Sequence, residues 1–416
     1  MQQAPDGTVI LSATDLVGYL ACDHLATLEL GRVVGRWERP IRRDDPTIEL
    51  IQAKGDLHEA AYLAELRVSG KSVVEIPKGE LRTPDDLRAA QAQTLQAMRD
   101  GADVVFQATF FDGRWRGHAD FLFKRDDRPS PGLGSWSYDI ADTKLARSVK
   151  GGAIIQMCVY AALLEGLQGI APEWLEVITG DRVRHPYRTA GFAAYFRSVK
   201  ARFEARVAAG LDGPAAPTYP DPVDHCRICS WYPMCIQRRR DDDHPSIVAG
   251  LGRLDTERLQ RAGVATLTGL AELPDGAAIK DLRSARLDRL RTQARLQLHE
   301  QRTGERVWEL AEPDPDEPGR GLAALPEPSP WDLFFDIEAD PWATDVGLEY
   351  LLGVVETVDG KPVYQAIWAT DQDEERLAFQ RFLDLVTDRL DAHPDMHRSE
   401  ERRVGKECRS RWSPYH

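Results

Sequence analysis

The pattern of hydrophobic and polar positions over the first 245 residues predicts helices on either side of a group of strands. Helical spacing and capping residues predict helices at about 15–30, 47–68, 83–99, 153–167 and 189–209. Alternating or β-branched runs predict strands at about 72–76, 103–111, 114–124, 137–144 and 174–179, with a hairpin across Asp112-Gly113. This order indicates one mixed α/β domain over residues 1–245.

The pattern changes after residue 245. Residues 246–310 show only helical spacing, with Gly263 between two short predicted helices. This segment is similar to a helix-hairpin-helix DNA-binding element, and a generic helical linker with a basic face is the alternative. Residues 311–330 are rich in proline and acidic residues, which predicts a linker. Residues 331–397 then predict three strands and a helix, the beginning of a second α/β domain.

Composition narrows the class of protein. The 416 residues have a net charge of −14, with 42% hydrophobic and 29% charged residues, which excludes a disordered or collagen-like chain. The sequence shows neither a signal peptide nor an apolar run long enough to cross a bilayer, so we expect a cytoplasmic protein without a membrane partner. The acidic total does not exclude a local basic groove that binds nucleic acid.

The last 19 residues, 398–416, resemble a translated sequencing adapter, and all of them match it. We therefore exclude this segment from fold reasoning, with a native basic tail as the alternative. Without it, 47 basic and 64 acidic residues leave a net charge of −17, and five cysteines remain. We then expect the second domain to be incomplete, with an exposed, unpaired strand edge.

Four polar features follow one another along the first domain. His58 lies on a predicted helix, Asp120 ends a Gly-x-x-Asp sequence inside a strand, and Asp142-Thr143-Lys144 ends the next strand. Gln156 and Tyr160 lie one turn apart on the following helix. Carboxylates on neighbouring strands suit a hard divalent cation, and Lys144 shares a face with Asp142. Each feature alone is also typical of a turn residue or a buried polar pair.

In this order the four features resemble the RecB-like branch of the PD-(D/E)XK nucleases, over residues 10–245. The resemblance implies a restriction-endonuclease-like mixed sheet flanked by helices. It also implies metal-dependent hydrolysis of DNA, by an exonuclease or flap-type enzyme acting on single-stranded ends in repair or recombination. Mg²⁺ or Mn²⁺ would be held by His58, Asp120, Asp142 and the backbone carbonyl of Thr143. Lys144 would orient the attacking water, and Gln156 and Tyr160 would hold the substrate.

Cys226, Cys229 and Cys235 are closely spaced in one loop that contains proline. In an intracellular protein such a triplet indicates metal ligands rather than disulfides. The fourth ligand is either His225 or the distant Cys22, and spacing alone fits zinc as well as iron–sulfur. Several RecB-like nucleases hold a four-iron four-sulfur cluster with one cysteine before the nuclease core and three after it. The resemblance therefore implies such a cluster on Cys22, Cys226, Cys229 and Cys235, with zinc as the alternative.

The second domain begins with a predicted strand that carries Asp336 and Glu338 on one face. This pair is similar to the first motif of RNase H-like 3′–5′ exonucleases, in which Asp-x-Glu begins a two-metal site. The resemblance implies a partial RNase H-like α/β domain over residues 331–397. Its other two acidic ligands are not identifiable, so we expect this second metal site to be incomplete.

Two other functions stay open at this point. The chain would be a catalytically silent nucleic-acid-binding scaffold, or its chemistry would lie in a complete RNase H-like domain acting on RNA or an RNA–DNA hybrid. DNA is the expected partner and RNA is the alternative. The sequence has no Gly-x-x-x-x-Gly-Lys-Ser/Thr phosphate loop, so unwinding of a duplex would require a helicase in trans.

Overall fold

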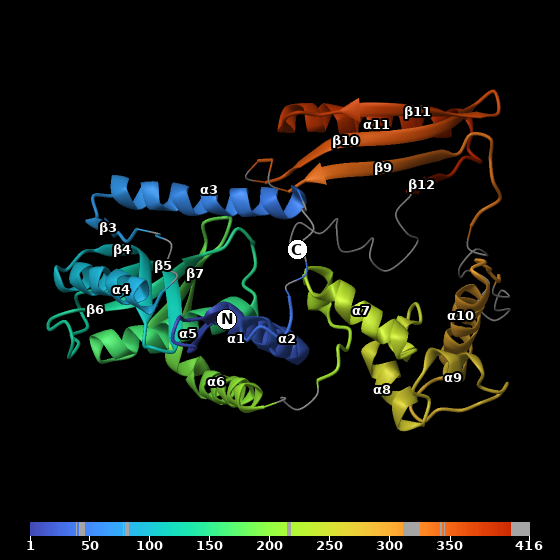
Figure 1. Cartoon of the computed structure of the whole chain (residues 1–416). Coiled ribbons are helices and arrows are strands. Elements are labelled where there is room, and N and C mark those ends of the chain that lie inside the picture. Colours follow the sequence, from blue (N-terminus) through green and yellow to red (C-terminus); the bar gives the residue numbers. More distant parts are fainter. Residues whose placement is uncertain are drawn as a thin grey trace. The chain divides into compact units, whose positions relative to one another are not determined.

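The computed structural model describes residues 1–38, 40, 46–77, 79, 83–213, 218–310, 325–341, 343–344 and 346–400. The chain divides into two compact units, unit 1 (Met1–Trp308) and unit 2 (Glu309–His416) (Figure 1). Most of the predicted linker, residues 311–324, lies outside the described residues. Residues 401–416 of the adapter-like segment also lie outside them.

A mixed sheet forms the centre of unit 1. Six of its strands are hydrogen-bonded in the order β3-β4-β5-β6-β7-β8. Strand β2 pairs with the first residues of β5, and β1 pairs with β2. Pairing is parallel for β3–β4, β2–β5 and β6–β7 and antiparallel elsewhere. The strands are β1 Gln2–Gln3, β2 Val9–Ser12, β3 Val73–Glu75, β4 Val104–Phe111, β5 Trp115–Arg125, β6 Ser137–Thr143, β7 Trp174–Ile178 and β8 Arg184–Arg188.

The five strands predicted for this unit are confirmed, and β1, β2 and β8 are additional. The sequence of β8, Arg-His-Pro-Tyr-Arg, is too polar for a pattern of apolar residues to reveal it. The mixed α/β class predicted for the first 245 residues is therefore confirmed.

Helices cover both faces of this sheet. In Figure 1, α3 lies along one side of the sheet, and α5 and α6 lie on the other. Two hydrophobic cores result: a smaller one joins Tyr62, Leu63 and Leu66 of α3 to the sheet, and a larger one lies beneath α1 and α5. The helices are α1 Ala13–Ala21, α2 Asp23–Val33, α3 Pro46–Val68, α4 Pro84–Arg99, α5 Gly151–Gln168, α6 Thr189–Asp212 and α7 Tyr232–Asp241.

The prediction of one helix at about 15–30 is wrong, because Cys22 interrupts it. Cys22 has φ −160° and ψ 112°, an extended conformation that ends α1 and begins α2. Its N–H still donates to the carbonyl of Gly18, and its own carbonyl accepts from Leu25. Asp23 then lies in the first turn of α2, where a negative charge is favourable. Cys22 therefore joins two helices and does not lie inside one.

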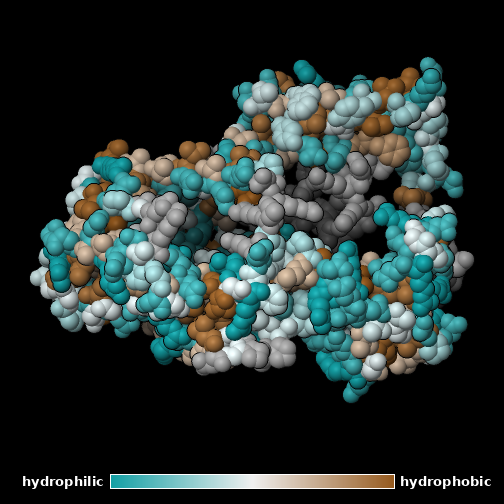
Figure 2. Space-filling view, viewed as in Figure 1, coloured by the Kyte–Doolittle hydropathy of each residue, from teal (hydrophilic) through white to brown (hydrophobic). Residues whose placement is uncertain are grey.

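The remainder of unit 1 is helical and has a core of its own. The helices α8 Arg253–Arg261, α9 Leu267–Ala271 and α10 Ser284–Thr303 pack leucines such as Leu259 and Leu290 together. Gly263 lies between α8 and α9 with φ +86°, which confirms the two predicted short helices. Figure 2 shows a mainly hydrophilic surface over α7 and α8. Binding of DNA by these helices stays a prediction.

Unit 2 contains a second, smaller sheet with the order β11-β10-β9-β12. The strands β9 Leu333–Asp340, β10 Leu348–Val358 and β11 Lys361–Trp368 are antiparallel neighbours, and the helix α11 Gln372–Ala392 follows them. Ala378, Phe382 and Val386 of α11 pack on one face of this sheet. The three strands and one helix predicted here are confirmed.

The adapter-like segment contributes the last strand of unit 2. β12, Arg398–Glu400, pairs in parallel with Leu333–Phe335 of β9. The expected unpaired edge is therefore not found at Leu333–Phe335, because the free N–H and C=O groups of an edge strand readily pair with an extended segment. No helix within the described ranges combines the length and apolar character that crossing a membrane requires.

Candidate active site

Asp120 and Asp142 lie on the neighbouring antiparallel strands β5 and β6. Oδ2 of Asp120 accepts hydrogen bonds from the N–H and the hydroxyl of Thr143, at 2.9 and 3.1 Å. The side chain of Asp142 is only 1% exposed, and the Lys144 ammonium forms an ion pair with it. Both predicted carboxylates and the predicted lysine therefore meet at one end of the sheet.

The charge of Asp142 is unfavourable in this position without a cation. Burial raises the pKa of its carboxyl well above the ordinary value, Asp120 raises it further, and Lys144 opposes the shift. Burial by itself would lower the pKa of Lys144, but the charges of Asp142 and Asp120 raise it overall. Oδ1 of Asp142 has no hydrogen-bond partner among the described residues. A buried carboxylate oxygen without a donor suits a group whose partner is a metal ion.

His58 reaches the same end of the sheet from α3, which covers the opposite face from α5. Its side chain is buried, and the ring bonds to the backbone of Ile178, next to Thr143 in the β6–β7 pairing. Nε2 has no partner among the described residues. Burial and the nearby Arg182 lower the pKa of His58, which keeps the imidazole neutral. A neutral ring held through one nitrogen, with the other available, is the form that binds metal.

The arrangement still differs from a formed metal site. Among the described residues, no three His, Cys, Asp or Glu side chains lie close enough together to hold one ion. Thr143, predicted as a ligand through its carbonyl, contacts Asp120 through its N–H and hydroxyl. Coordination by His58, Asp120 and Asp142 would therefore require the side chains to move toward a common centre.

Gln156 and Tyr160 face the carboxylates from α5. Gln156 Nε2 donates to the Tyr160 hydroxyl at 2.8 Å. Burial raises the pKa of Tyr160, and Asp142 and Asp120 are close enough to raise it further. Gly117 explains the close approach: a Cβ there would lie 2.7 Å from Cδ1 of Tyr160. The glycine three residues before Asp120 therefore makes room for Tyr160 against β5.

Three further residues of this region are not apparent from sequence motifs. A Cβ at Gly180 would lie 2.1 Å from the carbonyl oxygen of Leu145, the residue after Lys144. Glycine at position 180 therefore allows the two backbone segments to lie close together. Gln107 of β4 donates from Nε2 to Oε1 of Glu59, next to His58, at 2.6 Å. The negative charge of Glu59 contributes to the raised pKa of Lys144. The sequence offers no signal for Gln107, because nothing distinguishes it from other polar strand residues.

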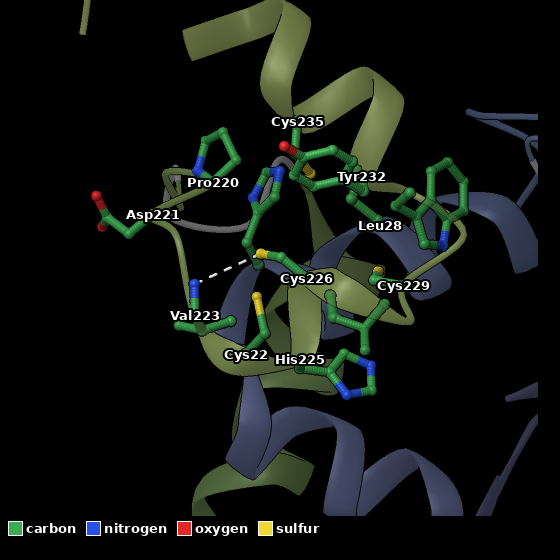
Figure 3. Close-up of a pocket in the computed structure, with 13 residues that line it drawn as sticks. Cys22, Leu28, Pro220, Asp221, Val223, His225, Cys226, Cys229, Tyr232 and Cys235 are labelled. Carbon is green, nitrogen blue, oxygen red and sulfur yellow. Dashed lines mark hydrogen bonds between the residues drawn. The ribbon is translucent and has the colours of Figure 1, made fainter. Parts of the chain in front are cut away.

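The four predicted cysteine ligands line one cavity of unit 1. Cys22 enters from the α1–α2 junction, Cys226 from the short 3-10 helix Asp224–Arg227, Cys229 from the turn that follows it, and Cys235 from α7 (Figure 3). The thiols of Cys22, Cys226 and Cys229 each raise the pKa of Cys235. Figure 3 shows the ring of His225 directed away from the sulfur atoms. Cys22, rather than His225, therefore accompanies the triplet.

The loop that carries these cysteines is fixed to α2. Trp231 is fully buried, and its indole N–H donates to Glu29 at 2.7 Å. The N–H of Val223 donates to Sγ of Cys226 at 3.4 Å, a bond that a thiolate would strengthen. Burial raises the pKa of Cys22 and Cys229, and that of Cys235 to about 11. Thiols in this state release protons when they bind a metal.

Asp336 and Glu338 lie on the same face of β9, opposite the face on which Phe335 and Ile337 pack toward α11. Both acidic side chains are partly exposed. The sequence prediction that they share one face follows from strand alternation and agrees with the structure.

Comparisons with known proteins do not add an assignment. No protein-family model matches the chain, and no curated protein matches it significantly.

Gly117→Ala tests the packing of Tyr160 on β5. The added methyl group would overlap the ring, so we expect the free energy of unfolding to fall by about 1–3 kcal/mol, measured by urea denaturation. Gly166→Ala on α5 is the matched control, because a Cβ there meets nothing within 4 Å. Equal effects of the two substitutions would contradict this role of Gly117.

Proposed function

We propose that unit 1 is a metal-dependent nuclease that hydrolyses DNA phosphodiester bonds. The observation that supports it best is the meeting of Asp120, Asp142 and Lys144 at one end of a mixed sheet, with a buried carboxylate oxygen left without a donor. A core that served only packing would not contain a buried carboxylate beside a second carboxylate and an ammonium, because their desolvation is costly. This argument also disfavours a catalytically silent scaffold.

The chemical roles follow from these contacts. Mg²⁺ or Mn²⁺, held by Asp120, Asp142 and His58, would supply positive charge to the phosphate oxygens. Asp120 is kept in place by Thr143, and Asp142 loses its proton when it becomes a ligand. Lys144, one third exposed, then keeps its proton and can hold a water molecule and the developing negative charge.

The substrate would approach from the side of Gln156 and Lys144, whose side chains are both partly exposed. The Tyr160 hydroxyl is buried and accepts from Gln156, so Gln156 is the member of the pair that can contact a DNA backbone, with Tyr160 orienting it. We propose a restriction-endonuclease-like fold for this unit and single-stranded ends as its substrate. A helicase in trans would supply such ends, and RNA is the alternative substrate.

We further propose that unit 2 has an RNase H-like fold. Three antiparallel strands followed by one helix support this fold, with Asp336 and Glu338 on one face of the first strand. A two-metal exonuclease site would need further acidic ligands beside these two. Unit 2 is therefore the second candidate for nuclease chemistry.

We also propose that Cys22, Cys226, Cys229 and Cys235 hold a four-iron four-sulfur cluster, with zinc as the alternative. They line one cavity from distant parts of unit 1, which supports a metal centre, and binding would bring their sulfur atoms closer together than they lie here. Such a centre would fasten the α1–α2 junction to the loop before α7, which is a structural role.

Lys144→Met tests the proposed nuclease chemistry. We expect metal-dependent cleavage of a fluorescent single-stranded oligonucleotide to fall by about 10²–10³-fold, with divalent binding by calorimetry retained. Lys124→Met on β5 is the matched control, since Lys124 pairs with Asp126 and lies over Trp136. Unchanged cleavage by the Lys144 variant would overturn the assignment, and loss of cleavage in Asp336→Asn instead would move the chemistry to unit 2.

The raised pKa of Asp142 predicts proton release on metal binding. Because the carboxyl holds a proton toward neutral pH in the absence of metal, affinity for Mn²⁺ should increase as the pH rises through this range. Calorimetry in two buffers of different ionisation enthalpy counts the protons released near pH 7. Asp142→Asn should abolish this release, and Asp126→Asn, which alters an exposed carboxylate, should not. Metal affinity independent of pH would contradict the prediction.

Cys235→Ser tests the proposed metal centre. In anaerobically purified protein we expect a broad visible absorbance and bound iron, both lost in the variant together with a lower melting temperature. Cys158→Ala is the control, because this buried cysteine of α5 lies in the hydrophobic core beneath that helix. Zinc in place of iron would select the alternative, and protein without either metal would contradict both.

A further inference from the structure

Gln107 has an unusual backbone conformation for the middle of a strand. Its φ is +57°, in the left-handed region that residues other than glycine rarely adopt, and it is only 6% exposed. β4 pairs with β5 through Phe106–Phe121 and Ala108–Ala119, so Gln107 lies opposite Asp120. The one left-handed residue described within a strand of unit 1 is thus the direct neighbour of a proposed metal ligand.

The alternation of side chains changes at this pair of residues. Phe106 and Phe121 belong to the core beneath α3, whereas Ala108 and Ala119 belong to the core beneath α5. In a regular strand, residues two positions apart lie on the same face. The alternation therefore shifts by one step at Gln107 on β4 and at Asp120 on β5.

This shift determines where the Asp120 side chain goes. Alternation continued from Phe121 would place Asp120 on the α5 side of the sheet, and alternation continued from Ala119 would place it on the α3 side. At the shift it enters neither apolar core. Its carboxylate instead reaches Thr143 at the end of β6, beside Asp142. The catalytic end of the sheet depends on this local irregularity.

A side-chain bond holds Gln107 in its conformation. Its amide donates to Glu59 of α3 at 2.6 Å, and Glu59 follows His58 in the sequence. An unfavourable backbone conformation persists only where surrounding contacts enforce it, and such residues cluster at functional sites. The same contact therefore links the helix that carries His58 to the strand that faces Asp120.

We propose that Gln107 is a positioning residue, whose left-handed conformation places the Asp120 carboxylate for metal binding. This inference rests on the proposed metal-dependent function of unit 1. It assigns no direct contact between Gln107 and the metal or the substrate. The backbone of Gln107 carries the effect, and its bond to Glu59 maintains that backbone.

The proposal is tested by substitutions at residue 107 that all remove the bond to Glu59 but differ in how easily they adopt the left-handed conformation. Gln107→Gly removes the bond to Glu59 but adopts the left-handed region freely, so we expect its dissociation constant for Mn²⁺ to stay within about threefold of the wild type. Gln107→Val strongly disfavours that region, and we expect its dissociation constant to rise about tenfold or more. Gln107→Ala, a milder change, should lie between them and serves where the valine variant does not fold.

Calorimetric titration with Mn²⁺ and thermal melting of the metal-free protein give two separate readouts. Thr109→Val is the control, because it removes a bond to His118 from the same strand without altering φ at residue 107. If Gln107 has only a structural role, the substitutions would lower the melting temperature, but Mn²⁺ affinity would not decrease from the glycine to the alanine to the valine variant. That result would overturn the inference. A wild-type protein that binds no Mn²⁺ would instead overturn the proposed function.

Discussion

The hydrogen bonds from Thr143 to Asp120 are the contact on which the candidate site depends. They join the middle of β5 to the last residue of β6, where the two strands have stopped pairing through their backbones. Without them, the ends of these strands would separate and the two carboxylates would lose their common position. One side chain thus acts both as a proposed ligand and as a link between strands.

The same region contains several features that lower the stability of a folded domain and that most domains avoid. Asp142 is buried beside another carboxylate, His58 has a buried nitrogen without a partner, and Gln107 has a left-handed backbone. The surrounding clusters beneath α3 and α5 consist of buried hydrophobic residues, which supply the stability that permits these exceptions. The cost is local, and it coincides with the residues proposed for chemistry.

Much of the fold follows from local sequence signals, because each depends on residues near one another in the chain. The hairpin at Asp112-Gly113, the capping box that begins α4 and the three strands of unit 2 are examples. The break at Cys22 was harder to see, since the residues on both sides favour helix. Strand β8 is too polar to be recognised from its own sequence.

For the candidate site, sequence order identified Asp120, Asp142, Lys144, Gln156 and Tyr160, which the structure brings together. It could not identify Gln107 or Gly180, because their importance arises from contacts with other strands. The backbone conformation of Gln107 and the close approach of Gly180 to Leu145 arise only in the assembled sheet. The residue types in the sequence therefore do not predict them.

The position of Cys22 also has a consequence for how the protein is made. Cys22 emerges from the ribosome early, while Cys226, Cys229 and Cys235 appear only after the whole sheet has been synthesised. A metal centre on all four thiols can therefore form only after the strands of the central sheet have been synthesised, and it would close a very long loop of chain. Insertion of the metal would then mark the completion of the domain, and a chain interrupted before the last cysteine would expose an unfilled binding site.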